Sequence, residues 1–276
     1  MPRRSWSVLS VLSLVALAVP ATLAATAAPA SAACPVAIVI GLHGVGERPS
    51  SSNSSTITHT FSSFQAAAAA AGEPSSSYIL DPFTYPVVPV RDFESAAGLK
   101  NLSATLDSTQ LALVTQVIDL RTACPTSAIE LAGYSLGAWI IHMALDNVTL
   151  WNDIRAAVYY GDPCWYNSSG GYIGLVRFAS ATNDDTTLGC PPESVYPYED
   201  QPPPFPVQSW CAYHDPICGQ GLSPSFSPAN IIHRFSLARN CSTRDGCTHF
   251  SYAGSEATTD GGRFLAQEAF GAGSAG

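Results

Sequence analysis

The chain has 276 residues, a formal net charge of −9 and eight cysteines. Its 21 acidic residues outnumber its 12 basic ones, and an acidic surface repels phosphate backbones, so we expect no nucleic acid as a partner. The length suits one large α/β domain with a sizeable core.

The first 32 residues have the three parts of an export signal. Arg3 and Arg4 precede an apolar stretch over 8–19, and the small residues "APASA" end at Ala32. The apolar stretch is shorter than the roughly 20 residues that span a membrane, and no other run approaches that length. We therefore expect a signal peptide over 1–32, a single mature domain over 33–276, and a secreted, extracellular protein with no stable membrane anchor.

Apolar runs in chain order predict alternating strands and helices. We expect strands over 36–41, within 83–90, and over 128–133, 154–161 and 207–213. We expect helices over 60–72, 100–122, 136–147 and 259–270. This alternation predicts an α/β fold with an open, mostly parallel central sheet and helices on both faces.

The pattern ends over 162–206, a stretch rich in Gly, Ser, Asn and Pro. Its last part, "YPYEDQPPPFP" (196–206), predicts a stiff surface loop, although its aromatic residues could instead line the rim of a substrate site. The role of this segment stays open at the level of the sequence.

The cysteines all lie after residue 33, and an even number in an exported chain predicts four disulfides. A zinc site is not expected, because the chain contains no CxxC pair and no HExxH motif. We expect no cofactor.

The stretch "IELAGYSLGAWII" (129–141) carries the strongest chemical signal. Residues 133–137 read GYSLG, which fits G-x-S-x-G, at the point where an expected strand meets an expected helix. The sharp turn of a nucleophile elbow leaves no room for side chains two residues on either side of the serine. This context favours Ser135 as a nucleophile over an incidental serine in a strand–helix turn.

A serine nucleophile needs a histidine base and an acid that orients it, in the order Ser, acid, His for open α/β hydrolases. Asp215 lies in "CAYHDPIC", where a short disulfide loop would hold its backbone; Asp162, after an expected strand, is the alternative acid. The pattern leaves both His233 and His249 as candidate bases. The other four histidines are not expected to be the base. His43 and His59 precede the serine, His142 follows it too closely in the chain, and His214 adjoins the candidate acid.

The segment "GLHGVGERP" after the first strand predicts an oxyanion loop. Its glycines let backbone N–H groups approach a substrate carbonyl, and its spacing does not fit a dinucleotide loop. We expect the N–H groups of Val45 and Leu136 to be the two oxyanion donors, and a structural role for His43.

These segments together resemble the cutinases, secreted serine esterases of the α/β-hydrolase fold. "GYSLGA" is similar to their G-Y-S-Q-G-A elbow, and "CPVAIVIGLHGVGERP" to their first strand and oxyanion loop. "CAYHDPIC" resembles their acid-bearing disulfide loop, and "THFSYAGS" their final histidine with a tyrosine three residues on.

The resemblance implies Ser135 as nucleophile, Asp215 as acid and His249 as base. It also implies the disulfides Cys34–Cys124 and Cys211–Cys218. Proximity in the chain suggests Cys164–Cys190 and Cys241–Cys247 for the others.

Three features depart from the family pattern. Leu136 replaces a glutamine, Val45 replaces a serine or threonine, and the gap between Asp215 and His249 is long enough to keep His233 as an alternative base.

We expect a monomeric, cutinase-like or lipase-like hydrolase of carboxylic esters. Candidate substrates are cutin-like polyesters, acylglycerols and other short-to-medium acyl esters, with acetylxylan-type deacetylation as an alternative. A non-catalytic lipid-binding or glycan-binding α/β domain is the alternative from another class.

Overall fold

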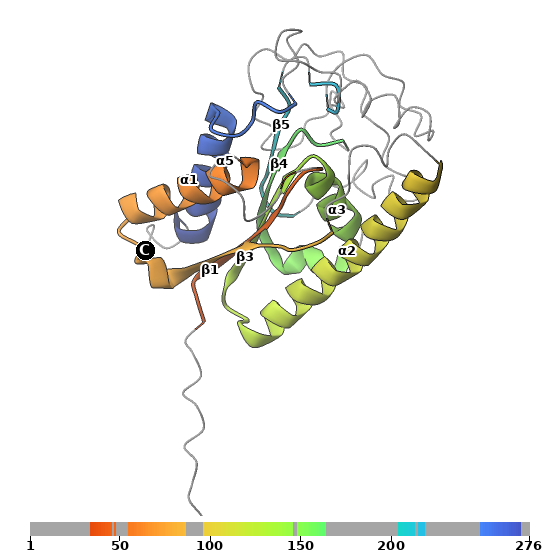
Figure 1. The fold of residues 1–276 in the computed structure, drawn as a ribbon. Helices are drawn as coiled ribbons and strands as arrows, with labels where there is room; N and C mark the ends of the chain where they lie inside the picture. Colours follow the sequence, from red (N-terminus) through yellow and green to blue (C-terminus); the bar gives the residue numbers. More distant parts are fainter. Residues whose placement is uncertain are drawn as a thin grey trace, which may run out of the picture. The chain divides into compact units, whose positions relative to one another are not determined.

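Five parallel strands form the centre of the structure, which is a computed structural model (Figure 1). It describes residues 34–45, 47, 55–86, 96–145, 148–163, 204–212, 215–218 and 249–271, all within one compact unit, Cys34–Gly276. The order across the sheet is β2-β1-β3-β4-β5. The strands are β1 (Ala37–Leu42), β2 (Tyr78–Pro82), β3 (Ala128–Tyr134), β4 (Ile154–Tyr160) and β5 (Val207–Trp210).

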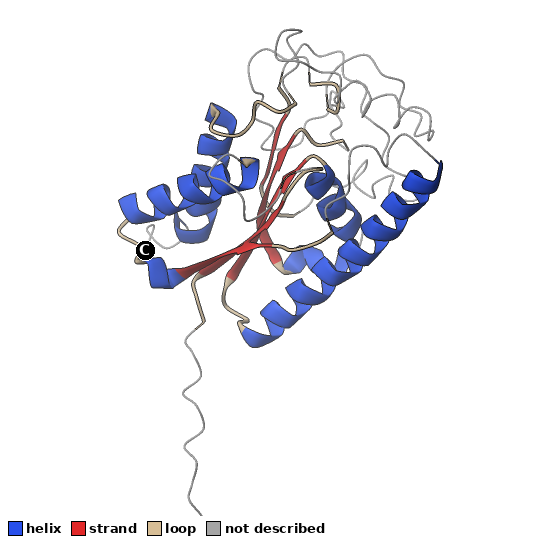
Figure 2. Cartoon of the chain, in the orientation of Figure 1, coloured by secondary structure: helices blue, strands red, loops and turns tan. Residues whose placement is uncertain are grey.

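Helices cover both faces of this sheet (Figure 2). The helices α1 (Thr56–Ala70) and α5 (Glu256–Phe270) pack on one face, and α2 (Ala96–Ala123) and α3 (Leu136–Leu145) pack on the other. Two short 3₁₀ helices, η1 (Ser75–Ser77) and η3 (Val148–Asn152), lie in the connections. The predicted α/β class, with an open parallel sheet between two helical layers, is confirmed.

Strand β3 shows why the central strands read as continuous apolar runs. Ile129 and Leu131 point into the core beneath α2 and α3, whereas Ala132 and Tyr134 point into the core beneath α1 and α5. Because both faces are covered, residues 129–134 of the strand are all buried and no alternation of buried and exposed positions remains. Because β1, β3 and β4 are parallel neighbours, their carboxyl ends lie side by side at one end of the sheet.

The strand expected within 83–90 is absent from the described half of that range, and a strand lies just before it. Strand β2 ends at Pro82, and residues 83–86 have no regular secondary structure; residues 87–90 lie outside the described part. The segment "YILDP" (78–82) forms β2, beside β1 with Ile38 opposite Ile79. Proline is tolerated at 82 because β2 is an edge strand and needs to pair on one side only.

Helix α1 begins four residues earlier than the alanine-rich pattern predicts. Ser55 is its N-cap, and the Ser55 Oγ accepts a hydrogen bond from the Thr58 N–H at 3.1 Å. The run of serine and threonine before residue 60 hid this start, since such residues are typical of both caps and loops.

A disulfide joins the two ends of the β1–α2 region. Cys34 precedes β1, Cys124 follows α2, and their sulfurs are bonded with the Cα atoms 5.4 Å apart. This is one of the two pairs that the resemblance implies. Cys164, Cys190, Cys241 and Cys247 lie outside the described residues, so their pairing stays a prediction.

Within the described ranges, no helix is both long enough and apolar enough to cross a bilayer.

Candidate active site

Ser135 occupies a tight turn between strand β3 and helix α3. Its backbone φ is 54°, in the left-handed region that non-glycine residues rarely adopt, and no other described non-glycine residue has a positive φ. The Ser135 N–H donates to the carbonyl oxygen of Tyr160 at the end of β4 (2.9 Å). A strained serine held between two strand ends is the geometry of a nucleophile elbow.

The two glycines of the GYSLG segment make this turn possible. A Cβ on Gly133 would lie 2.7 Å from the Cα of Ala138, and one on Gly137 would lie 2.8 Å from the carbonyl oxygen of His43. Both distances are shorter than any real Cβ contact. The glycines therefore let the first turn of α3 rest directly against its own strand and against the end of β1.

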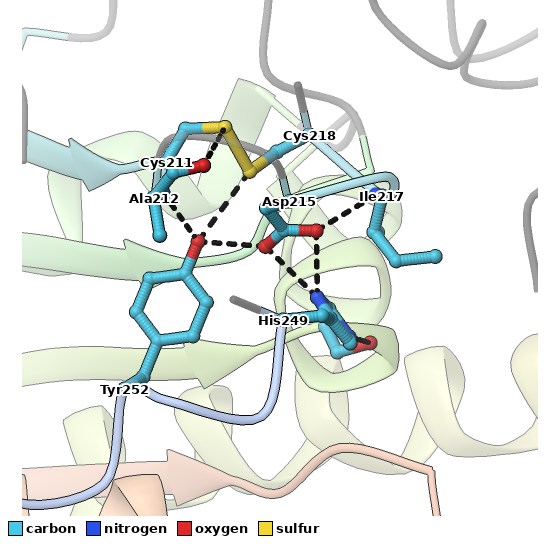
Figure 3. The surroundings of a disulfide bond; sticks show 8 residues. Cys211, Ala212, Asp215, Ile217, Cys218, His249 and Tyr252 are labelled. Atoms are coloured by element: carbon cyan, nitrogen blue, oxygen red, sulfur yellow. Dashed lines mark hydrogen bonds and ion pairs between the residues drawn. A yellow bond between two sulfur atoms is a disulfide. The ribbon is translucent and has the colours of Figure 1, made fainter. Parts of the chain in front are cut away.

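His249 lies between Ser135 and Asp215. Its Nε2 is 3.0 Å from the Ser135 Oγ. On its other side, Nδ1 is 2.9 Å from each carboxylate oxygen of Asp215 (Figure 3). Because a carboxylate only accepts, Nδ1 carries the proton and Nε2 is left to accept the serine hydroxyl. All three side chains are buried. Such a chain of hydrogen bonds allows an imidazole to remove a proton from a hydroxyl.

Two further donors hold the carboxylate of Asp215 in place. The backbone N–H of Ile217 donates to Oδ1 at 2.7 Å, and the hydroxyl of Tyr252 donates to Oδ2 at 2.7 Å (Figure 3). Burial, followed by the charge of Asp215, raises the pKa of Tyr252 well above its usual value, so the phenol keeps its proton. The Tyr252 oxygen in turn accepts from the Ala212 N–H at 2.7 Å.

The disulfide Cys211–Cys218 encloses the segment that carries Asp215. Its Cα atoms are 5.7 Å apart, and both cysteines are buried. Figure 3 shows this bond beside the Tyr252 hydroxyl, on the far side of the carboxylate from His249. The covalent link and the Tyr252 hydrogen bonds restrict the same short loop.

Tyr134 supports His249 from strand β3. Its hydroxyl donates to the His249 carbonyl oxygen at 2.7 Å, and the two rings stack with centroids 5.3 Å apart. Burial, then the charges of Glu47 and Asp215, raises the pKa of Tyr134 well above its usual value. The residue beside the serine in the motif therefore fixes the backbone of the histidine.

The loop after β1 lies directly against the serine. A Cβ on Gly44 would be 3.2 Å from the Ser135 Cβ and 2.6 Å from the Tyr134 ring. Val45 follows Gly44, and Leu136 follows Ser135 at the start of α3, where backbone N–H groups have no partner within the helix. The two segments that carry the expected oxyanion donors are thus in contact.

A model of the family described as Cutinase matches residues 33–229. The chain belongs to the cutinase family. It is therefore a carboxylic ester hydrolase, and the non-catalytic alternative is set aside.

Several solved structures are similar to this chain. A cutinase-like protein from Cryptococcus sp. is 19% identical, with a TM-score of 0.50 over 87% of this chain and 97% of that one. An acetyl xylan esterase in an iodinated complex gives 19% identity and a TM-score of 0.45, over 75% of this chain and 99% of that one. The catalytic core domain of acetyl xylan esterase from Trichoderma reesei gives 18% identity and a TM-score of 0.45, over 75% and 95%. A comparison with curated proteins gives no match.

The side chains of the other candidates from the sequence have other partners or lie outside the described residues. Asp162 is hydrogen-bonded to His142 of α3, with its Oδ2 2.6 Å from the His142 Nε2, instead of to His249. His43 is buried and stacks on Tyr85, with ring centroids 4.1 Å apart. His233, His214 and most of the 162–206 segment are not described.

Two residues of this cutinase-family site carried little or no signal in the sequence. Tyr252 was visible only as a tyrosine three residues after the histidine, with no partner indicated. Glu47 lies in the loop whose glycines predicted the oxyanion donors, and nothing in the pattern marked Glu47 itself. In the structure its carboxylate accepts from the Gly44 N–H at 3.2 Å. An acid that follows a glycine-rich loop by a few residues is the pattern that could have revealed it.

Within the described residues, no group of three histidine, cysteine or acidic side chains could hold a metal ion.

Proposed function

We propose that this cutinase-family enzyme hydrolyses esters through Ser135, His249 and Asp215. In this proposal His249 Nε2 takes the Ser135 hydroxyl proton while the serine oxygen attacks the ester carbonyl. Asp215 orients the imidazole through Nδ1 and stabilises its positive charge. The observation that carries the proposal is the unbroken hydrogen-bond chain from the Ser135 Oγ to the Asp215 carboxylate.

The tetrahedral anion is stabilised by the N–H groups of Val45 and Leu136. The contact of Gly44 with Ser135 and of Gly137 with the end of β1 supports this assignment, because it brings both segments to the serine. His249 then passes its proton to the leaving alcohol. A water molecule, activated by the same histidine, releases the acid from Ser135 and restores the enzyme.

Export is part of the proposal. Residues 1–32 direct secretion, and residues 33–276 form the mature catalytic domain, which acts outside the cell as a monomer. The disulfides Cys34–Cys124 and Cys211–Cys218 support an oxidising compartment, since such bonds persist outside the cytosol. The substrates we propose are cutin-like polyesters, acylglycerols and related short-to-medium acyl esters.

Turnover of p-nitrophenyl acetate by three variants tests the assignment of the nucleophile and base. We expect Ser135→Ala and His249→Ala to lower kcat by at least about a thousandfold, and His233→Ala to leave it close to that of the wild type. Loss of activity in His233→Ala with retention in His249→Ala would transfer the role of base to His233.

The acyl preference needs its own measurement. A series of p-nitrophenyl esters from acetyl to palmitoyl, together with acetylxylan, compares the polyester and acylglycerol substrates with polysaccharide deacetylation. A kcat/KM that peaks beyond the acetyl ester, with little release from acetylxylan, is the expected outcome. Efficient release from acetylxylan alone would contradict it.

A further inference from the structure

Glu47 connects the loop after β1 to the start of helix α1. Its Oε2 accepts from the Gly44 N–H at 3.2 Å, and its Oε1 accepts from the Thr56 N–H at 3.1 Å. Thr56 is the first residue of α1, whose N-terminal N–H groups have no partner within the helix. One carboxylate therefore joins the loop after β1 to the first residue of α1.

The peptide groups of Gly44 are occupied by this arrangement. Its carbonyl oxygen accepts from the Glu47 N–H at 3.3 Å and from the His43 Nδ1 at 3.0 Å, while its N–H donates to Glu47. Gly44 thus offers no donor to a substrate. The next N–H in the chain is that of Val45, for which no described residue provides an acceptor.

Gly44 also has almost no room to move. Its Cα faces the Tyr134 ring and the Ser135 Cβ so closely that a methyl group there would collide with the ring. The Glu47 carboxylate holds the N–H of the His43–Gly44 peptide, and the Glu47 backbone N–H bonds to the oxygen of the next peptide, Gly44–Val45. Because Gly44 is also packed against the elbow, fixing the first peptide limits how far the Gly44–Val45 peptide can rotate. That peptide carries the N–H assigned above to the oxyanion.

The charge of Glu47 also acts on this site. The pKa of Glu47 is raised, chiefly by burial, although the Thr56 and Gly44 N–H donors and the charge of His249 offset part of this rise. A carboxylate close enough to interact with His249 is suited to the step in which the imidazole becomes positive.

We propose that Glu47 is a positioning residue for ester hydrolysis, which holds the Val45 N–H toward the carbonyl oxygen of the substrate. The inference rests on the proposed function of Ser135 and Val45. Glu47 does not touch the substrate; its carboxylate acts through the Gly44 N–H, and so on the backbone that presents the Val45 N–H.

The test compares Glu47→Gln and Glu47→Ala with the wild type. Glu47→Gln keeps the size of the side chain but replaces one acceptor by an NH₂ group, so one of the two N–H donors loses its partner. We expect kcat for p-nitrophenyl acetate to fall by about 10- to 100-fold, with KM changed by less than about twofold, because the lost interaction belongs to the transition state.

A second measurement separates positioning from folding. An alkyl trifluoromethyl ketone adds to the serine and forms a tetrahedral oxyanion, so its inhibition constant should rise by about the same factor as kcat falls. The matched control is Glu256→Gln, which removes an exposed carboxylate from the first turn of α5. We expect this control to change neither kcat nor the inhibition constant, and to lower the melting temperature less than Glu47→Gln does.

Two results would overturn the inference. One is a Glu47→Gln enzyme with wild-type kcat and wild-type affinity for the ketone. The other is a loss of kcat matched by the loss of folded protein, with unchanged ketone affinity in the folded fraction. If the wild type itself neither turns over the ester nor binds the ketone, the proposed function fails, and that outcome is distinct from both.

Discussion

Asp215 receives hydrogen bonds from three groups, and one of them comes from a side chain that the reaction does not use directly. The Tyr252 hydroxyl lies between the Asp215 carboxylate and the Ala212 N–H, and bonds to each at 2.7 Å. A buried phenol with both its donor and its acceptor satisfied stabilises the loop and fixes the direction of the carboxylate.

Replacing Tyr252 by phenylalanine should therefore affect both activity and stability. The Ala212 N–H would lose its buried acceptor, which costs about 1–3 kcal/mol of unfolding free energy. Asp215 would lose a donor, and we expect kcat to fall by roughly tenfold as the carboxylate gains freedom. Steady-state kinetics and urea unfolding measure the two effects. Tyr78→Phe, in edge strand β2, serves as the control, and equal behaviour of the two variants would contradict this role for Tyr252.

Glu130 is a buried acid in the centre of β3, and it does not belong to the active site. Neither of its carboxylate oxygens has a hydrogen-bond partner among the described residues. Burial, then the charge of Glu268, raises its pKa well above 4.5, against a smaller opposite effect of Arg155. The folded protein therefore keeps a proton on Glu130 at pH values where the unfolded chain has lost it.

This difference predicts a pH-dependent stability. Above about pH 4.5 the unfolded state binds fewer protons than the folded state, so the free energy of unfolding falls as the pH rises. The slope from this group approaches about 1.4 kcal/mol per pH unit until the folded-state pKa is reached. Glu130→Gln should remove that slope, measured by urea unfolding between about pH 5 and 8. This range is chosen because burial can raise the pKa of a carboxyl group by about 3–5 units. Glu73→Gln is the control, and an unchanged slope in Glu130→Gln would contradict the prediction.

At the scale of the elements, the site is made where strand ends and a helix start meet. Helix α3 reaches the backbone of β1 because Gly137 has no side chain, and Ser135 is bonded to the end of β4. The elbow and the loop after β1 are thus parts of one packed contact.

Gly137→Ala tests that contact. The added methyl group would meet the carbonyl oxygens of Leu42 and His43, which are backbone atoms that cannot move aside alone. We expect a loss of at least about 2 kcal/mol in stability, as for overpacked cores, and a larger loss of kcat than the lost folded fraction explains. Thermal unfolding and ester turnover provide the measurements. Gly271→Ala, where the nearest atom is the flexible Gln267 side chain, should be tolerated.

The order of the elements could be predicted from the sequence because their signals are local. The apolar runs of β1, β3 and β4, and the GYSLG turn, each depend on neighbours in the chain. Strand β2 was missed because it lies at the edge of the sheet, where none of its residues is fully buried and no continuous apolar run marks it. The pattern of residues alone left His233 and His249 open, since only tertiary packing places His249 beside residues 34 and 114 positions away.

At the scale of the whole molecule, the two described disulfides close loops of very different length. Cys34 and Cys124 are 90 positions apart, whereas Cys211 and Cys218 are 7 apart and enclose Asp215. Loop-closure entropy predicts a stabilisation of roughly 4–5 kcal/mol for the long loop and roughly 2–3 kcal/mol for the short one. The short loop is also the one that holds the acid.

Removing the long-loop disulfide should therefore lower mainly the stability, and removing the short-loop disulfide should lower mainly kcat. We expect the Cys34→Ala/Cys124→Ala enzyme to lose more thermal stability and to keep most of its kcat below its unfolding transition. The Cys211→Ala/Cys218→Ala enzyme should lose less stability but at least about tenfold in kcat, because Asp215 loses its fixed backbone. Melting temperatures and kcat of the two variants decide this, and a larger loss of kcat from the long-loop pair would contradict it.

The central claim is that Ser135 is an activated nucleophile, and labelling with a fluorophosphonate tests it most directly. The reagent should modify the folded wild-type protein at neutral pH to about one label per chain, with the label on the peptide that contains Ser135. Ser135→Ala should take up none, and His249→Ala should react far more slowly. A folded wild-type protein that remains unlabelled, or that carries the label on another residue, would contradict the claim.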